Sequence, residues 1–357
     1  SIYLLTGSTK ASDRRIIHEK LENGEINILI GTHALLEDKV KFKNLGLAII
    51  DEQHRFGVAQ RSKLWHKNKF PPHVLVMTAT PIPRTLAMSV YGDLDISIID
   101  ELPPGRKTIK TVHRFDSNRL RVFRFIKDEI SKGRQVYIVY PLIQESEALD
   151  YKDLMDGYES ISREFPPDGS GPRYQISIVH GKMKSQDKEY EMNRFIKGET
   201  NIMVATTVIE VGVNVPNASV MIIESAERFG LSQLHQLRGR VGRGADQSYC
   251  ILMSSHKLSE NGRTRLETMV RTSDGFEIAE VDLRLRGPGD IMGTQQSGVL
   301  NLKIADIIKD HEILKLARSY ASELLRSDPS LLLPDNQPIK FTYIQLTKYK
   351  NIWNYIS

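Results

Sequence analysis

The sequence predicts an α/β protein made of two parallel-sheet domains followed by a helical hairpin. Short apolar runs alternate with helical-looking polar stretches through the first 255 residues, which is the rhythm of βαβ units. The segment DELPPGRKT (100–108) interrupts it with two prolines and a glycine, so a domain boundary is expected there. Strand patterns stop at about residue 262. We therefore predict domains at 1–100, 101–261 and 262–357.

Four apolar runs predict the strands of the first domain: IYLLTG (2–7), INILIG (26–31), LAIIDE (47–52) and HVLVMTAT (73–80). Between the first two runs, ASDRRIIHEKLENG (11–24) has Ile16, Ile17 and Leu21 at helical spacing and ends at a glycine. This stretch therefore predicts a helix.

Five further runs predict strands in the second domain: RQVYIVYPLI (134–143), YQISIVHG (174–181), TNIMVATTVIEVG (200–212), ASVMIIES (218–225) and QSYCILM (247–253). Proline and glycine crowd into REFPPDGSGPR (163–173), which predicts a loop. Residues 263–287 predict two helices around the turn SDG, and residues 305–329 predict one long amphipathic helix.

The composition narrows the class of protein. A hydrophobic content of 40% and a charged content of 26% are typical of a soluble globular chain, and no apolar run approaches the roughly 20 residues that cross a bilayer. The lone Cys250 excludes an internal disulfide and fits a reducing, cytosolic setting. A net charge of +5 permits a polyanionic partner. Because the sequence opens at Ser1 without an initiator Met or a targeting pattern, we expect a piece of a longer protein.

A pair of acids ends the third predicted strand, in LAIIDEQH (47–54). The carboxyl edge of a parallel sheet is where α/β folds bind ligands. There Asp51 can hold Mg²⁺, and Glu52 can activate the water that attacks a γ-phosphate, while Gln53 and His54 add groups that couple phosphate to a neighbouring element. The alternative for such a pair alone is a solvated strand end.

Three other motifs offer hydroxyl, glycine and guanidinium groups to phosphates. VMTATPIPRT (76–85) offers threonine hydroxyls beside the acids if the two strands are neighbours, although alone it is typical of a turn. ATTVIEVGVNVPNA (205–218) offers Thr206 and Thr207 to phosphates. QLRGRVGR (236–243) alternates glycine with arginine, and an arginine that crosses a domain cleft stabilises a transferring phosphoryl group, by about 10³–10⁵ in rate. Its alternative is a basic helix face.

Together and in this order, the motifs resemble those of the superfamily 2 helicases, motors with ATP between two RecA-like domains. The resemblance implies ATP and Mg²⁺ as cofactors, with Asp51 holding Mg²⁺ through ATP. It assigns catalysis to Asp51, Glu52, Gln53, His54, Arg240 and Arg243, and nucleotide binding to Thr78, Thr80, Gly212, Asn214 and Gln236. Asn214 stands where the family usually has Asp, so a weaker contact is expected there.

GTHALL (31–36) resembles the DNA-contacting loop of the first helicase domain, with Thr32 and His33 meeting phosphates. Residues 274–298 resemble the translocation segment shared by the RecG and Mfd families, and the form RGPGD…GTQQSG favours RecG. The resemblance implies that Arg265 and Arg286 bridge the two hairpin helices and that Gln296 lies on a moving loop. Without it, the favoured interpretation is a helical cap on the second domain.

The RecG resemblance implies a cytoplasmic, nucleoid-associated and monomeric translocase that remodels stalled forks and Holliday junctions in DNA repair and recombination. Its implied partners are branched or duplex DNA and a single-stranded DNA-binding protein. No G-x-x-x-x-G-K-[ST] loop occurs in the 357 residues, so the first RecA-like domain is expected to lack its P-loop strand. The family's P-loop and wedge domain are expected before Ser1, and we expect the chain alone to be inactive. An Mfd-like transcription-repair translocase and a non-catalytic DNA-binding module remain the alternatives.

Overall fold

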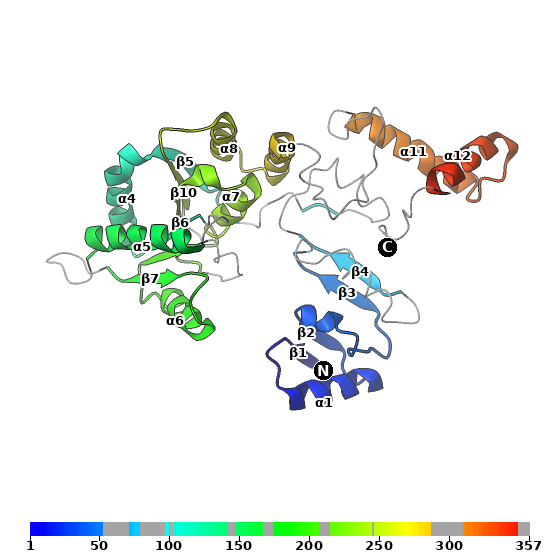
Figure 1. The fold of residues 1–357 in the computed structure, drawn as a ribbon, viewed down its shortest axis with the longest axis horizontal. Coiled ribbons are helices and arrows are strands. Elements are labelled where there is room, and N and C mark those ends of the chain that lie inside the picture. Colours follow the sequence, from blue (N-terminus) through cyan, green and yellow to red (C-terminus); the bar gives the residue numbers. More distant parts are fainter. Residues whose placement is uncertain are drawn as a thin grey trace. The chain divides into compact units, whose positions relative to one another are not determined.

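The computed structural model describes residues 1–52, 71–78, 97–99, 101, 103, 105–141, 147–166, 174–206, 215–244, 246–286 and 310–348. The chain divides into two compact units, one formed by Ser1–Thr80 with Met292–Ser357 and the other by Pro81–Ile291 (Figure 1). Within the described residues, no helix is long and apolar enough to span a membrane.

The first unit begins with a parallel pair of strands, β1 (Ile2–Leu5) and β2 (Ile28–Gly31), joined through helix α1 (Ala11–Asn23). The predicted helix is confirmed. It ends at Gly24, whose φ of 76° lies in the left-handed region and whose N–H caps carbonyls of the last turn, as helix ends commonly do. A small apolar core joins these elements to the short 3-10 helix η1 (His33–Leu36); it contains Leu5, Ile17, Leu21, Ala34 and Val40.

A second parallel pair in the same unit consists of β3 (Leu47–Ile50) and β4 (His73–Val76). The pair is in register from Leu47 opposite His73 to Ile50 opposite Val76. Both strands were expected from their apolar runs, and both end at the residues that precede the predicted acid and threonine motifs. The two motifs therefore start from neighbouring strands.

The C-terminal part of the first unit contains helices α11 (His311–Ser327) and α12 (Gln337–Lys348), with the short helix η6 (Pro334–Asn336) between them. The helix expected over 305–329 is confirmed in its described part. Asp328 organises the turn after α11, because its carboxylate accepts the backbone N–H groups of Leu332 and Leu333 and the side-chain amide of Asn336. These bonds hold the pKa of Asp328 below its usual value. The sequence pattern did not predict α12.

The second unit is built on a six-stranded, all-parallel sheet with the order β5-β10-β9-β6-β8-β7. The five predicted strands are confirmed as β6 (Gln135–Tyr140), β7 (Ile176–Val179), β8 (Ile202–Thr206), β9 (Ala218–Ile223) and β10 (Tyr249–Ser254). The sixth, β5 (Lys110–Phe115), lies at the edge. Its sequence KTVHRF mixes polar and apolar residues because an edge strand is only partly buried. No apolar run therefore predicted this strand.

Helices cover both faces of this sheet. One core contains residues of α4 (Arg119–Ser131) and α5 (Glu147–Glu164). The other contains residues of α6 (Ser185–Ile196), α7 (Leu231–Arg238), α8 (Glu260–Arg271) and α9 (Gly275–Arg286). The two helices expected around the SDG turn are therefore α8 and α9, and they share the core of the second unit. The predicted boundaries of the three domains stay a prediction.

Candidate nucleotide and nucleic-acid site

The predicted acids lie at the carboxyl edge of the β3–β4 pair. Asp51 follows Ile50 directly and is exposed, and Glu52 is half-buried. The ladder continues one residue past β4, because the Met77 N–H donates to the Ile50 carbonyl at 2.8 Å. Thr78 comes next and is exposed. One acid and one hydroxyl thus follow adjacent strands at the same edge.

The acid pair sits in a tight backbone turn. Glu52 has a φ of 51°, in the left-handed region that non-glycine residues rarely adopt. Its backbone N–H donates to Oδ1 of Asp51 at 2.9 Å. Such strained conformations, which cost on the order of 1–3 kcal/mol, are concentrated at functional sites. The turn therefore supports a functional interpretation of the pair over a plain strand exit.

This edge has the donors that a nucleotide-bound magnesium ion needs. Mg²⁺ is usually held by one or two carboxylates together with phosphate oxygens and water. No cluster of three or more His, Cys, Asp or Glu side chains that could hold a metal by itself occurs in the described ranges. The Asp51 carboxylate at this edge therefore fits a cation that arrives with ATP.

The predicted DNA loop of the first unit follows β2. Thr32 and His33 are both exposed, and they open the short helix η1. An exposed hydroxyl and an exposed imidazole at a strand end can meet phosphates.

The arginines of the second unit follow α7. Gln236 and Arg240 are half-buried, and Arg243 is exposed. Burial raises the pKa of Tyr137 to about 12, while the nearby guanidinium groups of Arg243 and Arg240 act to lower it. The two arginines therefore concentrate positive charge near the Tyr137 phenol, which is the property that binding a phosphate requires.

Two glycines shape the loop that carries these arginines. Gly242 has a φ of 80°, and a Cβ there would lie 3.0 Å from the Ile109 side chain. A Cβ on Gly244 would lie 2.5 Å from the Pro216 carbonyl oxygen. The Arg106 side chain also donates to the Gly242 carbonyl at 2.9 Å. Close packing thus explains Gly242, between Arg240 and Arg243, and Gly244, which follows Arg243.

Arg238 departs from the phosphate-facing role that the arginine–glycine alternation suggested. It is only 3% exposed, and its guanidinium donates to the carbonyls of Met269 and Thr272 at 2.9 Å and to Nδ1 of His235 at 3.0 Å. Met269 lies in the last turn of α8 and Thr272 is its C-cap residue, where a cation is favoured by the helix dipole. Arg238 therefore fastens α7 to α8.

His235 is held neutral by the same arrangement. Burial, and then the Arg238 charge, lower the pKa of His235 to about 4. Between pH 6.5 and about 4 the unfolded chain, whose His pKa is near 6.5, therefore binds more protons than the folded chain. The free energy of unfolding is unaffected by this histidine above pH 6.5 and falls as the pH drops through that range. We expect His235→Gln to remove an acid-dependent loss of about 3 kcal/mol in the free energy of unfolding.

Urea unfolding at pH 7.0, 5.5 and 4.5 measures this expectation. The matched control is His73→Gln, which replaces an exposed histidine of β4 in the first unit. An equal pH dependence in wild type and His235→Gln would contradict the expectation.

Two predicted DNA or hairpin residues show burial or contacts that their expected roles did not include. Thr206 is 2% exposed, and its Oγ1 is buried with no hydrogen-bond partner among the described residues, so its burial does not favour the predicted contact with nucleic acid. Arg265 donates to the carbonyls of Phe229 and Glu227, at the turn η5 (Ala226–Arg228) that precedes α7. It thus joins α8 to the turn η5 and to Phe229 after it. Only the backbone of Arg286 is described, so its bridge to Arg265 stays a prediction.

The remaining predicted residues lie outside the described residues, so their roles stay predictions: Gln53, His54, Thr80, Thr207, Gly212, Asn214 and Gln296.

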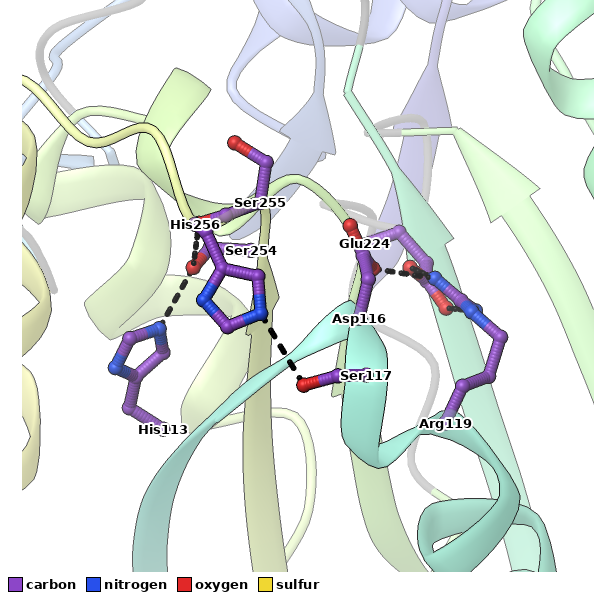
Figure 2. A network of polar contacts seen from close by, with 8 residues as sticks. All are labelled: His113, Asp116, Ser117, Arg119, Glu224, Ser254, Ser255 and His256. Atoms are coloured by element: carbon purple, nitrogen blue, oxygen red, sulfur yellow. Dashed lines mark hydrogen bonds and ion pairs between the residues drawn. The ribbon is translucent and has the colours of Figure 1, made fainter.

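A polar network at the carboxyl edge of the six-stranded sheet was not anticipated (Figure 2). Arg119 makes a bidentate ion pair with the buried Glu224, at 2.7 and 2.8 Å, and also pairs with Asp116. Glu224 directly follows β9, and its N–H donates to Val139 of β6. The Arg119–Glu224 ion pair therefore connects the start of α4 to the centre of the sheet. The sequence offers only isolated charges here, because residues 119 and 224 are far apart in the chain.

Matches to family models identify the class of protein as the superfamily 2 helicases. Residues 2–89 match the DEAD/DEAH box helicase family and residues 120–245 match the helicase conserved C-terminal domain. The structure of the Mycobacterium smegmatis helicase Lhr shares the fold, with a TM-score of 0.53 and 18% identity over 77% of this chain and 37% of that one.

Closer similarity specifies the family. Residues 272–357 match the C-terminal part of domain 3 of ATP-dependent DNA helicase RecG. RecG of Synechocystis is 52% identical over 92% of this chain, and RecG of Bacillus subtilis is 51% identical over 92%. A structure of RecG bound to a three-way DNA junction has a TM-score of 0.66 and 43% identity, over 88% of this chain and 39% of that one. The chain belongs to the RecG family of helicases, as its motifs predicted. It spans 39% of the Synechocystis relative and 47% of the Bacillus subtilis relative.

Proposed function

We propose that this chain supplies motor elements of an ATP-dependent DNA translocase or helicase that remodels branched DNA, including stalled forks and Holliday junctions, in repair and recombination. The observation that carries the proposal is the pair of phosphate-handling edges. Acids follow a strand end of the first unit, and arginines follow α7 in the second. The names of the relatives, and the junction-bound RecG structure, support the same activity.

In this proposal the bound nucleotide supplies a phosphoanhydride whose hydrolysis drives the motor, with Mg²⁺ neutralising its charge. Asp51 would hold the ion, Glu52 would orient and deprotonate the attacking water, and Thr78 would contact the phosphate from the adjacent strand. Arg240 and Arg243 stabilise the charge that develops on the phosphoryl group. The proposed catalytic and nucleotide-binding residues also include Gln53, His54, Thr80, Gly212, Asn214 and Gln236.

Side-chain contacts among α7, α8 and α9 would transmit a movement of Arg240 and Arg243 to the helical hairpin. Arg238 joins α7 to the end of α8, and Arg265 joins α8 to the turn before α7. Ser232 on α7 donates to the Asp282 carboxylate on α9 at 3.0 Å. Because α7, α8 and α9 also share one core, they would move together. Any displacement of Arg240 and Arg243 then reaches the segment after α9, where Gln296 is proposed to act on DNA.

DNA contact in this proposal is mainly to phosphates, at Thr32 and His33 of the first unit and at Thr207 of the second. We also infer a monomeric, nucleoid-associated cytoplasmic protein, with a single-stranded DNA-binding protein as a further partner.

The 357-residue chain alone should not hydrolyse ATP, because the sequence has no P-loop to anchor the nucleotide phosphates. We expect it to bind DNA weakly. Phosphate release measured with malachite green should stay at background with or without a three-way junction. Fluorescence anisotropy should show junction binding that weakens with salt, with a slope of about −0.9 per phosphate contacted. Robust DNA-stimulated hydrolysis, or binding that is insensitive to salt, would contradict the expectation.

The activity itself is tested in a RecG chimaera, in which the part of the Bacillus subtilis relative that precedes the matched region is followed by residues 1–357. The chimaera should hydrolyse ATP when a three-way junction is added, and Glu52→Gln should abolish hydrolysis while retaining nucleotide binding. A folded chimaera that binds ATP and DNA but does not hydrolyse would favour a non-catalytic DNA-binding module.

A further inference from the structure

A cavity of about 300 Å³ opens at one corner of the second unit, and none of the roles proposed above uses it. Its walls come from the edge strand β5, from the connection between β10 and α8, and from α8 itself; the lining residues are His113, Phe115, His256, Leu258, Arg263, Leu266 and Glu267. Phe115 pairs with Ser254 in the last register position of β5 and β10. The cavity therefore lies at the carboxyl ends of two parallel strands, where α/β sheets bind ligands.

One wall of the cavity consists of two aromatic rings that already stack on each other. The rings of Phe115 and His256 stack with centroids 4.4 Å apart and planes 18° apart. Nε2 of His256 lies 3.2 Å from the Ser117 hydroxyl (Figure 2), and this contact fixes the plane of the imidazole. Phe115 covers one face of the imidazole, and His256 as a whole is exposed, which leaves part of its ring accessible to a ligand. A flat aromatic ligand would meet a surface that is already in place.

Ser254 Oγ lies 2.7 Å from Nε2 of His113 and 3.0 Å from the Ser255 carbonyl oxygen. Its single hydrogen can serve one of these contacts. With that hydrogen on the Ser255 carbonyl, Nε2 of His113 carries the ring proton and donates to Ser254. Burial lowers the pKa of His113, which is consistent with the neutral ring. Nδ1 of His113 is then left as an acceptor.

The opposite wall adds one acceptor and one cation. Arg263, Leu266 and Glu267 are spaced i, i+3 and i+4, so they share a face of α8. The Glu267 charge is felt at His113, and a carboxylate can only accept hydrogen bonds. Arg263 is exposed and can bind a phosphate. The cavity thus combines an aromatic platform and apolar leucines with two acceptors and one guanidinium.

We propose that this cavity binds a nucleotide whose base carries an exocyclic amino group. The base stacks on His256, its amino group donates to Glu267 and to Nδ1 of His113, and Arg263 binds the phosphate. A free nucleotide and an unpaired nucleotide of a DNA strand share this chemistry. The free-nucleotide form is independent of the helicase proposal, whereas the strand form relies on its DNA binding.

Fluorescence of 2-aminopurine tests both sources with the full chain, because stacking quenches this amino-bearing base. One probe is 2-aminopurine riboside 5′-monophosphate, and the other is an oligothymidylate with a single 2-aminopurine. Saturable quenching of the monophosphate supports a free-nucleotide site, and quenching of the oligonucleotide alone supports a strand site. His256→Ala should weaken the quenching affinity about tenfold, since stacking of one base on an aromatic ring contributes about 1–3 kcal/mol. Glu267→Gln should weaken it about fivefold while leaving the anisotropy of plain oligothymidylate unchanged.

Tyr190→Ala is the matched control, because Tyr190 is an exposed aromatic residue on α6 that does not line the cavity. Quenching of neither probe, or equal quenching in wild type and His256→Ala, would overturn the proposal. Anisotropy with plain oligothymidylate separates the two ideas. Oligonucleotide binding that persists without quenching of 2-aminopurine would contradict the cavity site and would not contradict the helicase proposal.

Discussion

Arg243→Ala should lower junction-stimulated ATP hydrolysis by the RecG chimaera about 10³-fold or more, which is the range expected for an arginine that stabilises phosphoryl transfer. The physical reason is position. Arg243 is exposed beside the half-buried Arg240, so its charge is available to a ligand. Because the side chain is exposed, its removal should leave the free energy of unfolding almost unchanged. Steady-state hydrolysis with and without junction DNA provides the measurement.

Arg228→Ala is the matched control for that variant. Arg228 is also an exposed arginine of the second unit, in the turn η5 before α7, and its removal should change hydrolysis less than twofold. Arg243→Lys distinguishes charge from geometry, because an ammonium cannot reproduce the planar fork of a guanidinium. Hydrolysis by Arg243→Ala within tenfold of wild type would rule out the proposed role of Arg243.

Arg238→Leu should destabilise the second unit by about 3 kcal/mol. The substitution removes the donor from the carbonyls of Met269 and Thr272, and each buried acceptor left without a partner costs about 1–3 kcal/mol. It also releases the end of α8 from α7, so amide hydrogen exchange in α8 should accelerate. Urea unfolding and hydrogen exchange of the 357-residue chain are the two measurements.

Arg238→Lys should fall between wild type and Arg238→Leu, since a lysine keeps the charge but cannot reach both carbonyls with one planar group. Arg228→Leu serves as the exposed control and should cost less than about 0.5 kcal/mol. If Arg238→Leu is as stable as Arg228→Leu, the buried guanidinium does not stabilise the α7–α8 junction.

Strands with continuous apolar sequence were the most predictable part of the fold. β6, β8 and β9 lie inside the sheet and are almost fully buried, so both faces of each strand demand apolar residues. β5 could not be recognised in the same way, because an edge strand needs apolar residues at only some positions. The helix α12 was missed for a related reason, since its described side chains are mostly exposed and follow no buried stripe.

The order of the motifs by itself determined the family, because phosphate chemistry requires particular side chains directly after particular strands. It also placed the acid and threonine motifs at the ends of strands, and the register of β3 and β4 then brought Asp51 and Thr78 to one edge.

Only the tertiary structure decided which of the similar groups face outward. Within QLRGRVGR the arginines look alike in the sequence, yet Arg238 is buried on the end of α8 whereas Arg243 is exposed. The hydrogen bond of His113 joins residues 113 and 254, which are distant in the chain and meet only because β5 pairs with β10. Hydrogen bonds and burial depend on neighbours that the packing supplies, so local sequence pattern does not specify them.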